Sequence, residues 1–304
     1  DLAKNWEISA DRKVYTFTLR DGLKWHDDKT LTAEDVAFTI DVIQDPNAKS
    51  PLASDWKGVR YEVANDKTIK FYLPNTFSNF LANTRVGIIP KHLLDSVKRS
   101  NMRLHAFSQN PVGSGPYKFD GKSSDDKTIR LRAFDNYHFG KPNIETFKYH
   151  TYVSSSDMMD GYARTEIQGM GKVDPQYLDK VRSIGGLKIH QLNQPAYVAL
   201  FFNTSRSPFN NLELRRALTQ ATNRSEIIGD TLQGTASEQL TPLSNRFASQ
   251  PDTNTLKFDQ SVAKAVIAKL GITNQKFKLA TVRGGSYEQV AKAIEKQWQE
   301  AGID

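Results

Sequence analysis

The sequence predicts a mixed α/β protein that folds into more than one compact unit. Strand-type and helix-type patterns alternate along the whole chain, without an internal repeat or a low-complexity tract. At 304 residues the chain is long enough to form two or more hydrophobic cores. Its hydrophobic fraction of 38% and charged fraction of 25% are those of an ordinary globular protein. No apolar run approaches the roughly 20 residues that a membrane-spanning helix requires.

The N-terminal region predicts a strand, a charged turn and a helix, in that order. Residues 14–19 alternate with a period of two, which places one aromatic-rich side toward a core, the side of Tyr15, Phe17 and Leu19. Residues 20–22 end this strand. Thr32 is the expected N-cap of the helix, and Asp35 supplies a carboxylate three residues on. The apolar face of the helix consists of Ala33, Val36, Ala37, Ile40 and Ile43.

The next part of the chain predicts several short elements. Two strands are expected within residues 57–73, joined by a turn at residues 64–67. A helix is expected to start at Pro90. Proline lacks a backbone N–H, which costs nothing at a helix start because the N–H groups of the first turn have no partner within the helix. A turn at residues 110–116 leads into a strand, and residues 129–134 alternate as another.

The C-terminal half predicts two more strands and three helices. The apolar runs of residues 197–204 and 277–282 predict strands, and the first of them is expected to be buried. Residues 261–270 predict a helix that ends at Gly271. Two other helices are expected from the spacing of Leu214, Ala217, Leu218 and Ala221, and of Tyr287, Val290, Ala291, Ile294 and Trp298. A strand followed by a helix usually leads to a second parallel strand, and the chain stops there, so we expect a fragment of a longer protein.

Several motifs, spread over the chain, occur together in one protein family. The first motif comprises Trp6, Ser9, Asp11, Leu19-Arg20, Gly22, Lys24-Trp25-His26-Asp27-Asp28 and Leu31-Thr32-Ala33-Glu34-Asp35-Val36. The later motifs are residues 110–119 (NPVGSGPYKF), 135–142 (DNYHFGKP) and 208–224 (PFNNLELRRALTQATNR). Together they resemble the family 5 extracellular solute-binding proteins, the receptors of peptide-importing ABC transporters. Thr165 and Gln168 depart from that family's pattern, which has Gly and Asp at these positions.

The resemblance implies an α/β, periplasmic-binding-protein-like fold (type II, multi-lobed) with an incomplete third lobe. It places an accessory lobe at residues 1–90, a hinge-side lobe at 91–195 and the start of an opposing lobe at 196–304, with a hinge crossing near residues 194–196. It also implies a function without catalysis or cofactor. A monomer outside the cytoplasm, periplasmic or lipid-anchored, would capture a solute between closing lobes and deliver it to a membrane permease.

The resemblance also suggests ligand-contacting residues. Leu52 corresponds to a ligand-touching tyrosine of peptide-binding relatives and would keep the apolar contact without the hydroxyl group. Met170, Gly171 and Lys172 correspond to a loop that lies along the bound peptide, and Gln194 corresponds to another contact. The Lys172 ammonium group would suit a ligand carboxylate. Simple loop packing of Leu52 and a solvated Lys172 remain open alternatives. Because the residue that anchors the peptide amino terminus would follow residue 304, nickel complexes, opines and oligosaccharides also remain possible ligands.

The sequence gives little support for catalysis or metal binding. His26, Asp27 and Asp28 are consecutive, so their side chains are not expected to converge on one atom, and a solvated turn whose aspartates hydrogen-bond local backbone groups is the better interpretation. The other histidines lack metal-ligand spacing, and there is no cysteine. Residues 113–115 fit neither a nucleophile elbow nor a phosphate loop. Residues 283–285 precede a helix and could hold an anion, although a plain turn is the simpler interpretation.

The net charge of +7 raises the alternative of nucleic-acid binding or adhesion to an anionic cell envelope. Basic and acidic residues are interspersed along the sequence, and the longest basic cluster is Lys98, Arg99 and Arg103. We therefore expect a solvated basic surface and no specific nucleic-acid partner.

Overall fold

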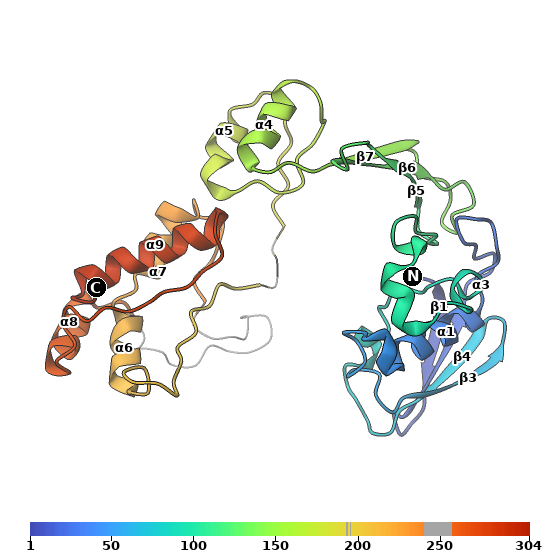
Figure 1. Cartoon of the computed structure of the whole chain (residues 1–304), viewed down its shortest axis with the longest axis horizontal. Coiled ribbons are helices and arrows are strands. Elements are labelled where there is room, and N and C mark those ends of the chain that lie inside the picture. Colours follow the sequence, from blue (N-terminus) through green and yellow to red (C-terminus); the bar gives the residue numbers. More distant parts are fainter. Residues whose placement is uncertain (193, 195, 240–256) are drawn as a thin grey trace. The chain divides into compact units, whose positions relative to one another are not determined.

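The computed structural model describes residues 1–192, 194, 196–239 and 257–304. It divides the chain into two compact units, Asp1–Thr151 and Tyr152–Asp304 (Figure 1). In these ranges no helix has the length and apolar character needed to cross a bilayer. The division into lobes at about residues 90 and 195 remains a prediction from the family resemblance.

The first unit contains a four-stranded antiparallel sheet covered by one long helix. The strands are β1 (Ala3–Ile8), β2 (Val14–Leu19), β3 (Arg60–Asn65) and β4 (Thr68–Tyr72), in the spatial order β1-β2-β4-β3. Along β2 buried and half-buried residues alternate, which confirms the period-two prediction. Helix α1 (Ala33–Gln44) packs against β3 and β4. The core between them contains Trp25, Trp56 and Phe80, all of them almost completely buried.

The start of α1 is fixed by the buried carboxylate of Asp35. One of its oxygens, Oδ2, accepts hydrogen bonds from the Thr32 backbone N–H (2.9 Å) and from the Trp25 indole (3.3 Å). The other, Oδ1, accepts a hydrogen bond from the backbone N–H of Lys91 at 2.9 Å, at the start of α3 (Lys91–Leu94). The predicted N-terminal cap is confirmed, and the same carboxylate also connects three separate segments of the unit.

The remainder of the first unit consists of short helical turns and a second sheet. The turns are η1 (Pro46–Ala48), α2 (Phe80–Asn83), η2 (Arg99–Leu104) and η3 (Ala106–Ser108). Strands β5 (Tyr117–Lys122), β6 (Thr128–Ala133) and β7 (Thr146–His150) form an antiparallel sheet in the order β5-β6-β7. The sequence patterns predicted β5 and β6 but missed β7, whose residues are nearly all exposed and show no alternation in burial.

The second unit is helical in the residues that the structure describes. Its larger helices are α4 (Ser155–Ala163), α6 (Leu212–Gln220), α8 (Gln260–Lys269) and α9 (Gly285–Glu300). The shorter ones are η4 (Pro175–Tyr177), α5 (Leu178–Arg182), α7 (Arg224–Glu226) and the π-helical turn η5 (Ile227–Thr231). α6 packs against α8, and their core also includes Trp298 of α9. The three predicted helices are confirmed, and Gly271 has the positive φ of +69° expected of a C′ residue.

The two strands predicted in this unit were wrong. Residues 197–204 and 277–282 contain no strand, and their side chains include Phe201 with 89% and Val282 with 70% of its surface exposed. Strands are stable only when a neighbouring strand pairs with their N–H and C=O groups. Such a partner is absent among the described residues of the unit, so the apolar runs are irregular. An apolar run alone therefore did not predict burial here.

Candidate ligand-binding site

Leu52 lies in the first unit, in the turn that follows η1. Its backbone N–H donates to Ser50 Oγ at 3.2 Å, and its carbonyl accepts from the Asp55 N–H at 3.1 Å. The side chain is 38% exposed. Local hydrogen bonds thus hold the loop, and they leave part of the apolar side chain accessible for contact.

Met170, Gly171 and Lys172 lie in the second unit, on the connection between α4 and η4. Met170 is partly buried, whereas Gly171 and Lys172 are exposed. A Cβ atom added at Gly171 would have no neighbour within 4 Å, so the space beside this residue is open. No ion pair of Lys172 is found among the described residues.

Just before this loop, the structure shows why glycine suits a position where this chain departs from the family pattern. Thr165 follows α4 with a φ of +61°, the left-handed conformation that glycine adopts without strain. The next residue, Glu166, forms an ion pair with Arg164 at 2.7 Å and accepts from the Tyr152 hydroxyl group at 3.3 Å. These contacts hold the turn in place although a β-branched residue occupies the strained position.

Gln194 is exposed and also belongs to the second unit. Of the five predicted contact residues, Leu52 alone lies in the first unit and the other four lie in the second. Only Met170, Gly171 and Lys172 lie together, as consecutive residues of one loop. Their role in ligand contact remains a prediction. The peptide-contact hypothesis comes from the family resemblance, and the observed exposure supplies the accessibility that it requires.

The His26-Asp27-Asp28 turn directs its three side chains toward three different segments. The His26 ring contacts residues 113–115, Asp27 Oδ2 lies 2.7 Å from His92 Nε2, and Asp28 Oδ1 accepts from Asn136 Nδ2 at 2.7 Å. The prediction that the side chains do not converge is confirmed. One expected bond to the local backbone is present, since Asp27 Oδ1 accepts from the Lys29 N–H at 3.3 Å. The other contacts of the turn reach segments that are distant in the sequence.

Both ring nitrogens of His26 bond to backbone groups. The Gly113 N–H donates to Nδ1 at 3.1 Å, so the other nitrogen, Nε2, carries the proton and donates to the Gly115 carbonyl at 3.0 Å. A Cβ atom at Gly113 would lie 3.2 Å from Cε1 of the ring, so glycine permits this close approach. Desolvation by burial lowers the pKa of His26 and favours this neutral form.

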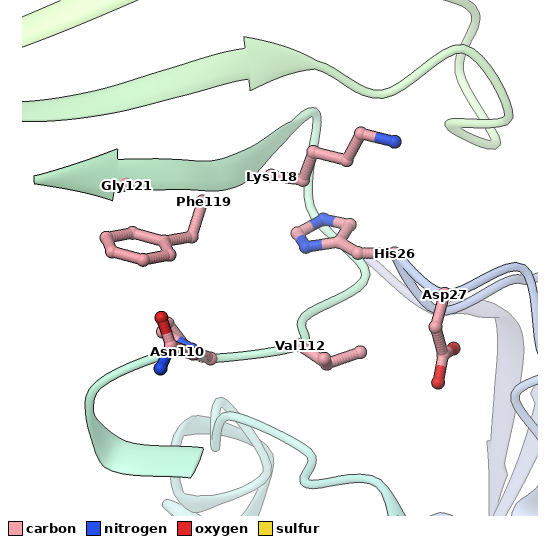
Figure 2. Close-up of a pocket in the computed structure, with 8 residues that line it drawn as sticks. His26, Asp27, Asn110, Val112, Lys118, Phe119 and Gly121 are labelled. Atoms are coloured by element: carbon pink, nitrogen blue, oxygen red, sulfur yellow. The ribbon is translucent and has the colours of Figure 1, made fainter. Parts of the chain in front are cut away.

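A cavity of about 360 Å³ adjoins this histidine (Figure 2). It is lined by His26, Asp27, Asn110, Pro111, Val112, Lys118, Phe119 and Gly121. In the close-up, the imidazole ring lies between the β5 strand and the loop that carries Val112. Because both ring nitrogens already have backbone partners, the ring holds the N-terminal turn against residues 113–115.

A second cavity of about 410 Å³ is bordered by α1, β3 and α3. Three of its carboxylates have partners, which are Glu34 with Lys91 (2.9 Å), Asp41 with the Tyr61 hydroxyl group (2.8 Å) and Glu62 with the Tyr72 hydroxyl group (2.6 Å). Burial and the Asp41 carboxylate raise the pKa of Tyr61 to about 12, so the phenol stays protonated. Within the described ranges, no group of three or more potential ligand side chains could hold a metal ion.

The possible anion site at residues 283–285 is weakened by the structure. Gly284 precedes α9, and its N–H donates to Glu288 Oε2 at 2.6 Å. The pKa of Glu288 is lowered by the Lys292 side chain first and by this N–H next. A protein carboxylate therefore already occupies the position that an external anion would take.

Comparison with known proteins identifies the class. The model of the bacterial extracellular solute-binding proteins, family 5 (Middle), matches residues 1–304, and the chain belongs to this family. The dipeptide-binding protein of Escherichia coli (strain K12) is 28% identical over 297 residues, which cover 89% of this chain and 54% of that protein. The ABC transporter substrate-binding protein CtaP of Listeria monocytogenes is 30% identical with a TM-score of 0.85, over 100% of this chain and 64% of the other.

The same fold also occurs in NikZ of Campylobacter jejuni, solved in complex with Ni(L-His). It is 24% identical with a TM-score of 0.84, over 100% of this chain and 63% of that one. At this identity the likeness shows the fold alone. It confirms a type II periplasmic-binding-protein-like α/β architecture for the part present. The chain spans about half the length of the E. coli relative. Members of the family are extracytoplasmic binding proteins.

Proposed function

We propose that this chain is part of the solute receptor of an ABC importer, and that its most suitable ligands are peptides. The observation that carries the proposal is the family match along all 304 residues. The similarity to a dipeptide-binding protein supports peptides as the ligand class. The receptor would bind its ligand outside the cytoplasm, close its lobes around it and deliver it to a membrane permease. It would act as a monomer, without a catalytic step, in the periplasm or lipid-anchored at the cell surface.

Physical chemistry supports a peptide ligand in such a receptor. Main-chain hydrogen bonds supply affinity that is independent of the peptide sequence, and open side-chain pockets tolerate varied residues. Leu52 and Met170 would provide apolar contact, Gly171 would leave room, and Gln194 would offer an amide. The ammonium group of Lys172 would bind a peptide carboxylate by a charge-assisted hydrogen bond.

The charge contact can be tested with two lysine variants. Lys172→Gln should weaken the binding of a peptide that has a free carboxyl terminus about fivefold, which corresponds to the loss of about 1 kcal/mol. Lys180→Gln, an exposed lysine on α5, is the matched control and should leave the dissociation constant unchanged. Isothermal titration calorimetry measures both. Equal affinities for the Lys172 variant and the unmodified protein would remove Lys172 from the site.

A non-peptide solute is the second candidate, because NikZ has the same fold and was solved with a nickel–histidine complex. Native mass spectrometry of the protein isolated from its source cells under non-denaturing conditions distinguishes the two. A mixture of short peptides bound at one per protein is the expected result. Recovery of a metal complex, an opine or an oligosaccharide would reject the peptide proposal and retain the receptor class.

A further inference from the structure

The strand register of the β5-β6-β7 sheet gathers four cationic side chains on one face. Lys118 lies opposite Arg132, and Arg130 lies opposite Lys148. Directly opposite residues of antiparallel strands share a face, and so do residues two apart on one strand. Arg130 and Arg132 are two apart on β6, so all four side chains belong to the same side of the sheet. We call this side the basic face.

The opposite side of the same sheet is apolar. The register pairs Phe119 with Leu131, Leu131 with Phe147 and Ile129 with Tyr149. Tyr117 also lies on this side, and its ring centroid is 6.3 Å from that of Phe147. The sheet is therefore amphipathic, with aromatic and aliphatic side chains mainly on one side and cations on the other, apart from Lys122, which lies opposite Ile129 on the apolar side.

The four cations of the basic face have no carboxylate partner within 4 Å in the part of the chain that the structure describes. Arg130 Nη2 donates to the Asp120 carbonyl at 3.3 Å, and Lys118 Nζ lies 5.9 Å from the centroid of the Phe134 ring. The nearby Asp135 forms its ion pair with Lys141 at 2.8 Å. The Lys141 side chain first, and then Lys118 and Arg132, lower the pKa of Asp135, so it remains ionised but engaged elsewhere.

Like charges placed directly opposite each other destabilise an antiparallel sheet. Two such pairs on one small sheet reduce its stability, and among the described residues no ion pair within 4 Å offsets them, although the more distant Asp135 attracts Lys118 and Arg132. An external anionic partner would turn this repulsion into attraction. The arrangement therefore favours a binding surface over a merely solvated one.

We propose that the basic face docks the protein onto a bilayer surface rich in anionic lipids. Arg130, Arg132 and Lys148 are exposed on this side of the sheet, on neighbouring strands about 4.8 Å apart, and half-buried Lys118 lies beside the His26 cavity at its edge, so three charges are free to meet lipid headgroups together. Figure 1 shows β5, β6 and β7 side by side in one narrow sheet. The family is extracytoplasmic, so its members meet membrane surfaces, and the net charge of +7 adds long-range attraction.

Nucleic acid fits the basic face less well. Proteins that bind single strands interleave cations with aromatic rings on which bases stack. Here the aromatic residues of β5 and β7, namely Tyr117, Phe119, Phe147 and Tyr149, lie on the apolar side, while Thr128 and Thr146 accompany the cations. The one ring that the register adds to the described basic face is His150, which lies opposite Thr128 and bonds to its hydroxyl group at 3.0 Å, so the face offers charge without a Phe, Tyr or Trp ring for stacking.

Vesicle co-sedimentation of the 304-residue protein tests the proposal. The probes are vesicles of phosphatidylcholine alone and vesicles with one third phosphatidylglycerol, each at low and at high salt. Binding is expected for the anionic vesicles at low salt and should disappear at high salt, because the attraction is screened. Each basic residue near an anionic surface is worth roughly fivefold in affinity, so Arg130→Gln with Lys148→Gln should weaken the partition constant about 25-fold.

The matched control is Lys188→Gln with Lys264→Gln. These lysines are exposed in the second unit, and their replacement lowers the net charge by the same amount. The control should change the partition constant less than twofold. Circular dichroism establishes that both double variants are folded, and the lipid and salt dependence of the unmodified protein tests the proposal without any variant.

Three results would overturn the proposal. The first is equal loss of vesicle binding in both double variants, which would assign the effect to overall charge. The second is equal binding to neutral and anionic vesicles, or binding to neither. The third is tighter binding to duplex DNA than to vesicles of equal phosphate content, provided that the double variant of Arg130 and Lys148 loses this DNA binding. That result would assign the basic face to nucleic acid.

Discussion

His26→Ala tests the junction between the N-terminal turn and residues 113–115. The substitution removes the hydrogen bond from the Gly113 N–H (3.1 Å) and the one to the Gly115 carbonyl (3.0 Å). Each is worth about 1 kcal/mol. The substitution also removes the edge-on contact with Phe134, whose ring centroid is 5.1 Å from that of His26, and it leaves a void. These two effects add about 1 kcal/mol more. The first unit should therefore lose about 3 kcal/mol of unfolding free energy.

The same residue predicts a pH dependence. Burial lowers the pKa of His26 in the folded protein, so the unfolded chain binds the proton more readily. Its contribution to stability is therefore fully present above the ordinary histidine pKa of about 6.5, and it is lost as the pH falls through the lower folded value. Protonation would also place a proton on Nδ1, which now accepts from Gly113. The destabilisation caused by His26→Ala should be largest at pH 8 and should shrink at pH 5.

Urea unfolding followed by tryptophan fluorescence measures both effects, because Trp25 and Trp56 are buried in the core of the first unit. His190→Ala, at an exposed position of the second unit, is the control and should change the unfolding free energy by less than about 0.5 kcal/mol. A loss below about 1 kcal/mol at pH 8, or a loss that is the same at pH 5 and pH 8, would refute this account of the histidine.

Three further changes test other parts of the structure by the same unfolding measurement. Thr165→Gly removes a β-branched residue from a φ of +61° and should stabilise the second unit by about 1 kcal/mol; a loss of stability would show that the turn is unstrained. Lys148→Glu should stabilise the first unit by about 0.2–1 kcal/mol, because Arg130 is directly opposite, and unchanged stability would contradict the strand register. Gly161→Ala would place a Cβ atom against the Tyr152 ring and should cost about 1–3 kcal/mol, so full stability would show that this ring moves freely.

Local patterns predicted the strand β2, the start of α1 and the C-terminal helices, but they missed β1, β7 and α4. The alternation in β2 and the cap at Thr32 depend on residues a few positions apart, and the structure has both. The strand predictions for residues 197–204 and 277–282 were wrong, because a strand also needs a pairing partner that local sequence does not specify.

The contacts made by distant residues could not be read from the sequence. His26 meets Gly115 across 89 positions of the chain, and no spacing rule connects them. The basic face arises in the same way, since Arg130 and Lys148 become neighbours only through the pairing of β6 with β7. The order of charges along the sequence therefore indicated dispersed cations, whereas the β5-β6-β7 sheet brings several of them together on one face. The predicted ligand contacts came from family resemblance, because exposed loop positions carry no periodic signal.

The carboxylate of Asp35 has a consequence for how the first unit opens. It holds the Trp25 side chain, the first turn of α1 and the start of α3 by three hydrogen bonds. Loosening any one of these segments removes a donor from a buried charge, which weakens the hold on the other two. Their protected amides should therefore exchange with solvent hydrogen as one cooperative group, at a common rate, although 66 positions separate Trp25 from Lys91 in the chain.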